Sequence, residues 1–177
     1  MYTHFPMIFG RRGSMKLSRH VYTEQEFHQQ EEPPVYHREI GPVVFKQGDE
    51  VATVKYEPCH SNAEYSDYRQ GQGRVWTKWL LSEDGNKAEG ISESGINMFA
   101  DFYMEPGASI GQHQHSDKEE IYYLLEGTLK ISVEDAEGGC TERTLMPGDM
   151  HFIRLGQSHA ALAGSEGARV VSVCVKG

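Results

Sequence analysis

The sequence predicts an all-β protein, and three observations support this prediction. Apolar and polar residues alternate over several short segments, as they do in strands with one buried face. Turn-forming residues separate these segments at regular intervals, which gives about eight to ten short strands. The chain has 177 residues, a length that suits one domain with a sizeable core. A β-sandwich or β-barrel is therefore expected.

Composition narrows the classes of function. A hydrophobic content of 38% and a charged content of 24% are those of an ordinary soluble globular protein. The formal net charge of -9 argues against a general nucleic-acid binder, because phosphate binding needs a basic surface. No apolar run approaches the ~20 residues that span a bilayer, and the N-terminus lacks a signal-peptide pattern. We therefore expect a cytoplasmic protein with no nucleic-acid or membrane partner.

The N-terminal part is expected to differ from the rest of the chain. Thr23-Glu24-Gln25-Glu26 has the pattern of a capping box and predicts a short helix that ends by Pro33-Pro34. We assign residues 1–34 to an N-terminal arm with this helix and residues 35–177 to the β-domain. The helix is expected to cover an open edge or end of the barrel. Residues 35–45 are expected to be irregular.

The strands follow from alternation and from the turns between them. Residues 50–57 predict one strand, and residues 74–81 predict another that carries Trp76 and Trp79 on opposite faces. One of these tryptophans should fill the core, and the other should lie at a dimer contact or a pocket rim. In residues 96–104 every second side chain is apolar, so that face must be buried. Later strands are expected over residues 120–125, 128–134 after a hairpin at Gly127, 150–153 and 168–175.

One stretch, residues 107–127, concentrates the side chains that can carry chemistry. His113 and His115 are two positions apart, so both imidazoles lie on one face if the segment is extended. A polar turn follows, and the next strand opens with a carboxylate at Glu120. Such a hairpin brings three ligands to one point. Imidazole and carboxylate together suit a divalent transition metal better than calcium, which prefers oxygen ligands. A fourth ligand is available downstream at His159, which follows a turn at Gly156.

These two stretches resemble the two motifs of the cupin family. The first matches G-x5-H-x-H-x4-E-x6-G at Gly107, His113, His115, Glu120 and Gly127. The second resembles G-x5-P-x-G-x2-H-x3-N through Gly148, Gly156 and His159, with Arg154 in place of the proline and Ala163 in place of the asparagine. The resemblance implies a single-domain cupin jelly-roll barrel and a homodimer. It also implies that one metal ion is bound by His113, His115, Glu120 and His159. Glu119 is the competing carboxylate, but the spacing to Gly127 favours Glu120.

The resemblance implies a metal with room for a substrate. Three neutral imidazoles and one carboxylate leave a divalent ion with net positive charge and two open positions in an octahedral shell, as a catalytic metal needs. Fe(II) is the expected metal, with Mn(II), Ni(II) and Zn(II) as alternatives. Tyr122 shares the inward face of Glu120 and is the candidate acid or base; the alternative is a tyrosine packed in the interior. Ala161 and Ala163 follow His159 on its face and are expected to leave space there.

Three other polar positions are candidates for the site. Two of them, His151 and Arg154, have two interpretations each. His151 either lines the pocket or faces outward. Arg154 either binds a carboxylate substrate or is solvated. Cys59-His60 is interpreted as a solvated loop, because it has no partner pair at metal-ligand spacing.

Two classes of function follow. The first is a metal-dependent enzyme that acts on a small polar metabolite, and the three-His, one-Glu set resembles that of many small cupin dioxygenases. An Fe(II) dioxygenase is therefore expected, with a lyase, an isomerase or a decarboxylase as alternatives. The second class is a non-catalytic cupin that binds a small molecule. Fold resemblance alone does not choose between these chemistries.

Overall fold

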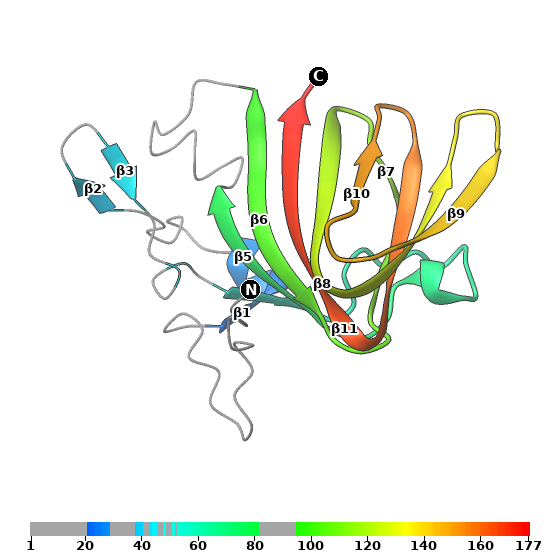
Figure 1. Ribbon diagram of the computed structural model, residues 1–177, viewed down its shortest axis with the longest axis horizontal. Coiled ribbons are helices and arrows are strands. Elements are labelled where there is room, and N and C mark those ends of the chain that lie inside the picture. The colour runs from blue at the N-terminus through cyan, green and yellow to red at the C-terminus, as the bar shows by residue number, and fades with distance from the viewer. Residues whose placement is uncertain are drawn as a thin grey trace.

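The computed structural model describes residues 21–28, 38–40, 43–45, 48, 51, 53–81 and 95–177, and the structural statements below concern these residues. Strands dominate this part of the chain and curve around a common interior (Figure 1). The predicted all-β barrel is confirmed. Within the same ranges, no helix is both long enough and apolar enough to cross a membrane.

One nine-stranded sheet contains every strand except β2 and β3, which pair with each other as a hairpin. The expectation that residues 35–45 are irregular is therefore wrong where they are described. The elements, in chain order, are β1 (Val21–Thr23), α1 (Glu24–His28), β2 (Arg38–Ile40), β3 (Val43–Phe45), β4 (Thr53–Tyr56), the 3-10 helix η1 (Tyr68–Gln70), β5 (Val75–Leu81), β6 (Ile96–Met104), β7 (Ser109–Gln114), β8 (Lys118–Glu134), β9 (Cys140–Leu145), β10 (Met150–Ile153) and β11 (Ser158–Lys176).

The two longest strands, β8 and β11, connect the parts of the barrel (Figure 1). The first half of β11 pairs with β7, its second half pairs with β6, and both halves pair with β8. The predicted hairpin at Gly127 is wrong, because β8 continues through this residue. Gly127 has a φ of 79°, and a Cβ on it would overlap the carbonyl oxygen of Gly167 on β11. Glycine thus allows a bend with an irregular register instead of a reversal.

The register of the strands aligns inward-facing side chains in rows across the sheet. Residues directly opposite each other in neighbouring strands share a face. The row that matters most for the site crosses β5, β6, β11, β8 and β10 through Trp79, Ala100, Ser172, Tyr122 and His151. We call it the central row. The next row places Met98, Cys174, Glu120 and Ile153 side by side.

The hydrophobic core lies on the other side of the central row. Phe102, Val170 and Leu124 form the neighbouring row and are at most 5% exposed. Burying each such side chain stabilises the fold by about 1.5–3 kcal/mol. Ala161 and Ala163, which were expected to leave space beside His159, lie inside this core. Their small size therefore serves packing.

The N-terminal elements lie against the barrel. β1 pairs in parallel with β4, and Thr23 and Glu26 form the predicted capping box. In it the Thr23 N–H donates to the Glu26 carboxylate at 2.8 Å, and the Glu26 N–H donates to the Thr23 hydroxyl at 3.3 Å. Phe27 of α1 stacks on Trp79 with ring centroids 6.0 Å apart. The predicted domain boundary at residue 34 and the predicted end of the helix lie outside the described residues.

Exposed apolar side chains lie on β10 and on its neighbour β8, and β10 is the last strand in the order of the sheet. Met150 and Phe152 on β10 and Tyr123 on β8 are 40–51% exposed. A strand with an open edge and an apolar outer face favours contact with another chain. The homodimer stays a prediction, and this surface is the one that we expect it to use.

Candidate metal centre

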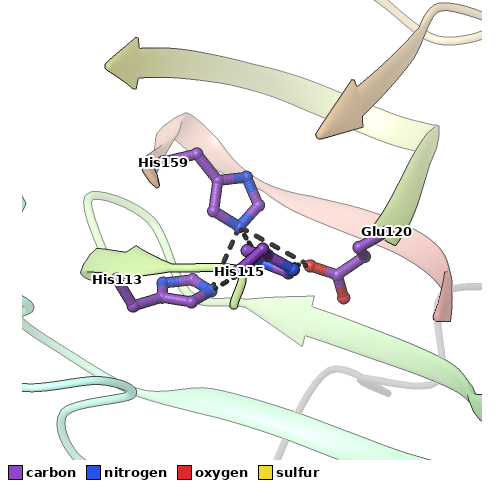
Figure 2. Close-up of side chains that lie close together, drawn as sticks. All are labelled: His113, His115, Glu120 and His159. Atoms are coloured by element: carbon purple, nitrogen blue, oxygen red, sulfur yellow. Dashed lines mark hydrogen bonds and ion pairs between the residues drawn. The ribbon is translucent and has the colours of Figure 1, made fainter. Parts of the chain in front are cut away.

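Four side chains from three parts of the chain converge on one point inside the barrel (Figure 2). His113 comes from β7, His115 follows β7 directly, Glu120 comes from β8, and His159 comes from β11. The three imidazole Nε2 atoms lie 3.1–3.3 Å from one another. Glu120 Oε2 lies 3.4 Å from the Nε2 of His115 and 3.5 Å from that of His159. All four ligand atoms lie within 4.8 Å of each other.

These separations suit ligands of a single metal ion. Metal–nitrogen bonds of about 2.1 Å put neighbouring ligand atoms about 3.0 Å apart in an octahedron and about 3.4 Å apart in a tetrahedron. The observed nitrogen–nitrogen and nitrogen–oxygen separations fall at or near this range. The chain therefore brings together the four residues that the sequence singled out, at distances that fit a first-row divalent ion.

Backbone carbonyls fix the tautomers of two of the histidines. His113 Nδ1 lies 2.8 Å from the carbonyl oxygen of Gly111, and His115 Nδ1 lies 3.3 Å from that of Lys118. A carbonyl oxygen only accepts, so each Nδ1 donates its hydrogen and each Nε2 presents a lone pair to the centre. Lone pairs that face one another at about 3 Å repel. A cation between them relieves this repulsion.

Burial keeps the imidazoles neutral. Desolvation is the main cause that lowers the pKa of His113 to about 3, and it lowers the pKa of His159 well below the usual value and that of His115 in the same direction. Protons therefore do not neutralise the facing lone pairs near pH 7. The neutral imidazole is also the form that binds a metal. On these grounds, the donor set fits a divalent transition metal ion.

The pKa of Glu120 is shifted in the opposite direction, upward. Its burial raises its pKa to about 7, although a hydrogen bond from the Ser172 hydroxyl to Oε1, at 2.5 Å, works against the shift. That hydrogen bond occupies Oε1 and leaves Oε2 facing the histidines. Ser172 therefore orients the carboxylate as the carbonyls orient the imidazoles.

His151 orients the third imidazole. The sequence left open whether this residue faces the pocket or the solvent, and the structure places its Nε2 3.2 Å from His159 Nδ1. Desolvation lowers the pKa of His151 to about 4, so both rings are neutral and share one hydrogen between these nitrogens. Arg154, the other open position, is exposed, and its backbone N–H donates to the Gln157 side chain. It is not among the residues that line the pocket.

The candidate centre opens onto a pocket of about 470 Å³. His113, His115 and Glu120 line one part of it, and Lys118 lines it as well. Lys118 precedes Glu120 by two positions on β8 and so shares its face. Sequence reasoning missed this residue, because it treated Lys118 as part of a polar turn. The sequence did contain a pattern that predicts its position: Lys118 is two residues from Glu120, as Tyr122 is, so all three side chains share one face of the strand.

The Cys59-His60 segment, interpreted from the sequence as a solvated loop, lies beside the candidate centre. His60 is exposed, as expected of a loop, yet its ring stacks on that of His113 with centroids 4.0 Å apart. The segment runs along β7, where the Gly111 N–H donates to the carbonyl of Cys59 at 3.0 Å. A Cβ on Gly111 would overlap the carbonyl oxygen of His60, so glycine is needed for this close approach. Both residues of the pair line the pocket.

Tyr122 lies between the centre and the core. It is 4% exposed, and its ring centroid lies 5.2 Å from that of His159 and 5.3 Å from that of Phe102. Burial and then the charge of Glu120 raise the pKa of Tyr122 well above 10. The phenol therefore keeps its proton near pH 7. This favours the role of a donor over that of a base.

Comparisons with known proteins agree with this architecture. Residues 100–175 match the family model described as the cupin domain. The oxalate-binding protein of Thermotoga maritima is 33% identical over 99 residues, which are 54% of this chain and 69% of that protein. The crystal structure of a predicted oxalate decarboxylase from Thermotoga maritima matches 73% of this chain and 96% of its own, with 24% identity and a TM-score of 0.55. A variant of the Bacillus subtilis oxalate decarboxylase matches 58% of this chain and 26% of its own, with 19% identity and a TM-score of 0.50. At these identities the two solved structures show the fold alone.

Metal binding is expected to release about one proton below pH 7 and almost none above it. The imidazoles are already neutral, whereas Glu120, with a pKa of about 7, must lose its proton to bind a cation. A bound proton competes with the metal, so affinity should rise with pH up to about 7 and then level off. Titration calorimetry of the metal-free protein with Mn(II), at about pH 6 and about pH 8.5 in buffers of different ionisation enthalpy, measures this release. Glu120→Gln is the control: it should bind metal more weakly, and the metal that it binds at high Mn(II) concentration should release no proton. Release of two or more protons at the lower pH would contradict the lowered imidazole pKa values.

Replacing His151 is expected to weaken metal binding although it is not one of the four ligands. His151→Phe removes the partner of His159 Nδ1 and should lower metal affinity roughly 10- to 100-fold. His151→Gln, which keeps a hydrogen-bonding group at this position, should recover part of the loss. Arg154→Ala is the matched control, because that side chain is exposed, and it should bind metal as the wild type does. Equal affinities for His151→Phe and wild type would show that His159 needs no such partner.

Proposed function

This chain belongs to the cupin family, and we propose that it binds a small carboxylate anion of the oxalate type at a divalent metal ion and decarboxylates it. The observation that carries the proposal is the set of three imidazole nitrogens and one carboxylate converging at a pocket that Lys118 also lines. His113, His115, Glu120 and His159 would hold the ion. When bound, the ion supplies positive charge that polarises the carboxylate of the substrate.

Lys118 is proposed to bind the anion. Its side chain lines the pocket on the face that carries Glu120, so a carboxylate near the metal centre also lies within reach of the ammonium group. A cation in a partly enclosed site attracts anions more strongly than one in bulk water. The chain as a whole carries a formal charge of -9, so Lys118 provides a local positive charge in an acidic protein.

Tyr122 is proposed as the proton donor. Decarboxylation of oxalate breaks the carbon–carbon bond, releases carbon dioxide, and adds one proton to the remaining carbon to give formate. The raised pKa of Tyr122 keeps its phenol protonated, and the residue lines the pocket beside Glu120. The carbon that accepts the proton is a far stronger base than phenolate, so a weak acid suffices. Solvent then returns the proton to Tyr122.

The decarboxylase has better support than the expected Fe(II) dioxygenase. The dioxygenase expectation rests on the three-His, one-Glu set, and one metal set serves several chemistries in this fold. The ligand of the relative that is 33% identical, by contrast, is oxalate. Fe(II) stays the predicted metal, and Mn(II), Ni(II) and Zn(II) stay its alternatives.

Metal analysis and a product assay test the proposal together. Purified protein is expected to hold about one divalent ion per chain, and the loss of one ligand typically removes most of the affinity. His113→Ala, His115→Ala, Glu120→Ala and His159→Ala should therefore each contain much less metal. Metal-loaded protein given oxalate should form formate and carbon dioxide in equal amounts.

Each other outcome points elsewhere. Wild-type metal content in all four variants would show that the site assignment is wrong. Oxygen uptake in proportion to product would support the dioxygenase instead. Oxalate binding without any product would leave a non-catalytic binding protein.

Lys118→Met is expected to weaken oxalate binding roughly 10- to 100-fold, the usual effect of losing a hydrogen bond between charged groups. Metal content should be retained, because the Lys118 carbonyl that holds His115 belongs to the backbone. Lys130→Met is the matched control on the same strand, since Lys130 pairs with Glu142 at 2.9 Å, outside the pocket lining. Calorimetric titration with oxalate compares the two. Equal affinities would remove Lys118 from the proposal.

Tyr122→Phe is expected to lower the decarboxylation rate roughly 10²- to 10⁴-fold, the usual contribution of a positioned acid. The phenyl ring preserves packing, so metal content and oxalate affinity should change little. Tyr123→Phe is the control, because Tyr123 is 44% exposed on the opposite face of β8. Formate production by both variants is measured under saturating oxalate. A rate for Tyr122→Phe within a few-fold of wild type would support the interpretation as a packed interior tyrosine.

A further inference from the structure

The central row contains a gap between two aromatic side chains. Trp79 and Tyr122 stand on β5 and β8, and the two strands between them contribute only Ala100 and Ser172. With neighbouring strands about 4.8 Å apart, the backbone positions of the two aromatic residues are about 14 Å apart. Ser172 is fully buried and its hydroxyl donates to Glu120, so the hollow in this row lies at Ala100. Trp79, Ala100 and Tyr122 all line the pocket.

The two walls of this hollow are held in place. The Trp79 indole N–H donates to the Tyr56 hydroxyl at 3.1 Å. The Phe27 ring stacks on the Trp79 ring, with an angle of 13° between the two ring planes. Tyr122 packs edge-on against Phe102. Rigid aromatic walls favour a flat guest, because a ring can stack between them without ordering flexible side chains.

The pocket is larger than oxalate requires. Oxalate has six non-hydrogen atoms and, at about 30 Å³ each, the share of a water molecule in the liquid, would fill at most about 180 Å³. The pocket measures about 470 Å³, which lies in the range of sites for larger ligands. More than half of the space therefore remains for another part of the substrate.

The side chains that line the remaining space are mainly apolar, with polar exceptions that include Thr77 and Glu24. Beyond the metal centre the lining includes Val75, Met98, Phe102 and Ile110 in addition to the aromatic walls. Glu24 of α1 also lines the pocket, and α1 lies on the Trp79 side, where Phe27 stacks. A negative charge at that end repels a second carboxylate. The far end therefore suits an uncharged, apolar group.

We infer that the pocket accepts a 2-oxo acid carrying an aromatic group, with its carboxylate at Lys118 and the metal centre and its ring over Ala100 between Trp79 and Tyr122. The carboxylate end of this inference rests on the proposed function. The position of the aromatic ring is inferred from the side chains of the central row. The substrate class is thus an aryl 2-oxo acid, which shares with oxalate two oxygen atoms on adjacent carbons.

A matched pair of ligands tests the inference. Pyruvate and phenylglyoxylate have the same 2-oxo acid head and differ only in a methyl group or a phenyl ring. Titration calorimetry of the metal-loaded protein should show that phenylglyoxylate binds at least about 10-fold more tightly, because its ring buries apolar surface. Oxalate is titrated alongside them to test the proposed function.

Two variants locate the ring. Ala100→Leu fills the floor of the hollow, and Trp79→Leu removes one wall; each should bring the ratio of the two affinities close to one. Trp76→Leu is the matched control, because Trp76 lies on the other face of β5, where its indole donates to Glu105 at 3.0 Å. It should keep the wild-type ratio. If Ala100→Leu does not fold, the two tryptophan variants decide the question.

The outcomes separate the two proposals. Equal affinity for pyruvate and phenylglyoxylate in the wild type, or an unchanged ratio in Ala100→Leu and Trp79→Leu, overturns the aromatic hollow and leaves oxalate binding intact. Failure of the metal-loaded protein to bind oxalate and both 2-oxo acids overturns the proposed function, and with it this inference.

Discussion

The site depends on three imidazole Nε2 atoms that the fold holds facing one another. Two backbone carbonyls accept hydrogen bonds from the Nδ1 atoms of His113 and His115, so the Nε2 lone pairs of these two rings face the centre. His159 adds a third lone pair when its Nδ1 donates to His151. Burial also keeps protons off these rings. Unsatisfied polar groups in an apolar interior are unfavourable. The surrounding fold must therefore hold this arrangement, and a bound cation is what makes it favourable.

The long strands supply that support. β8 contributes Glu120, and β11 contributes both His159 and the Ser172 that orients Glu120. Two ligands and one orienting group are thus parts of the same two strands. Their bend at Gly127 lets one strand pair serve both the metal centre and the packed core. Core packing and metal geometry are thus coupled through the backbone. A site on rigid strands is also more exactly placed than one on loops.

Sequence periodicity could predict the four residues of the centre but little of what surrounds them. The two-residue spacing of His113 and His115 places both on one face in any extended segment. The contact of His151 with His159, and the row that joins Trp79 to Tyr122, depend on register between strands that are distant in the chain. No local pattern encodes that register. The prediction of a hairpin at Gly127 was wrong for a related reason: a glycine between apolar runs is equally typical of a hairpin and of a bulge.

The same register places the residues proposed for chemistry and those proposed for substrate selection next to one another. Of the four ligands, Glu120 lies in the row of Met98 and Cys174, and the next row on the same inner face carries both Ala100 and Ser172, which donates to Glu120. Ala100 has no polar side-chain atom and is not a ligand, so a change of size there alters the space for a substrate and keeps the four donor residues. A fold of this kind can retain one metal centre while neighbouring rows vary. Selection of the substrate is then a matter of which side chains stand between Trp79 and Tyr122.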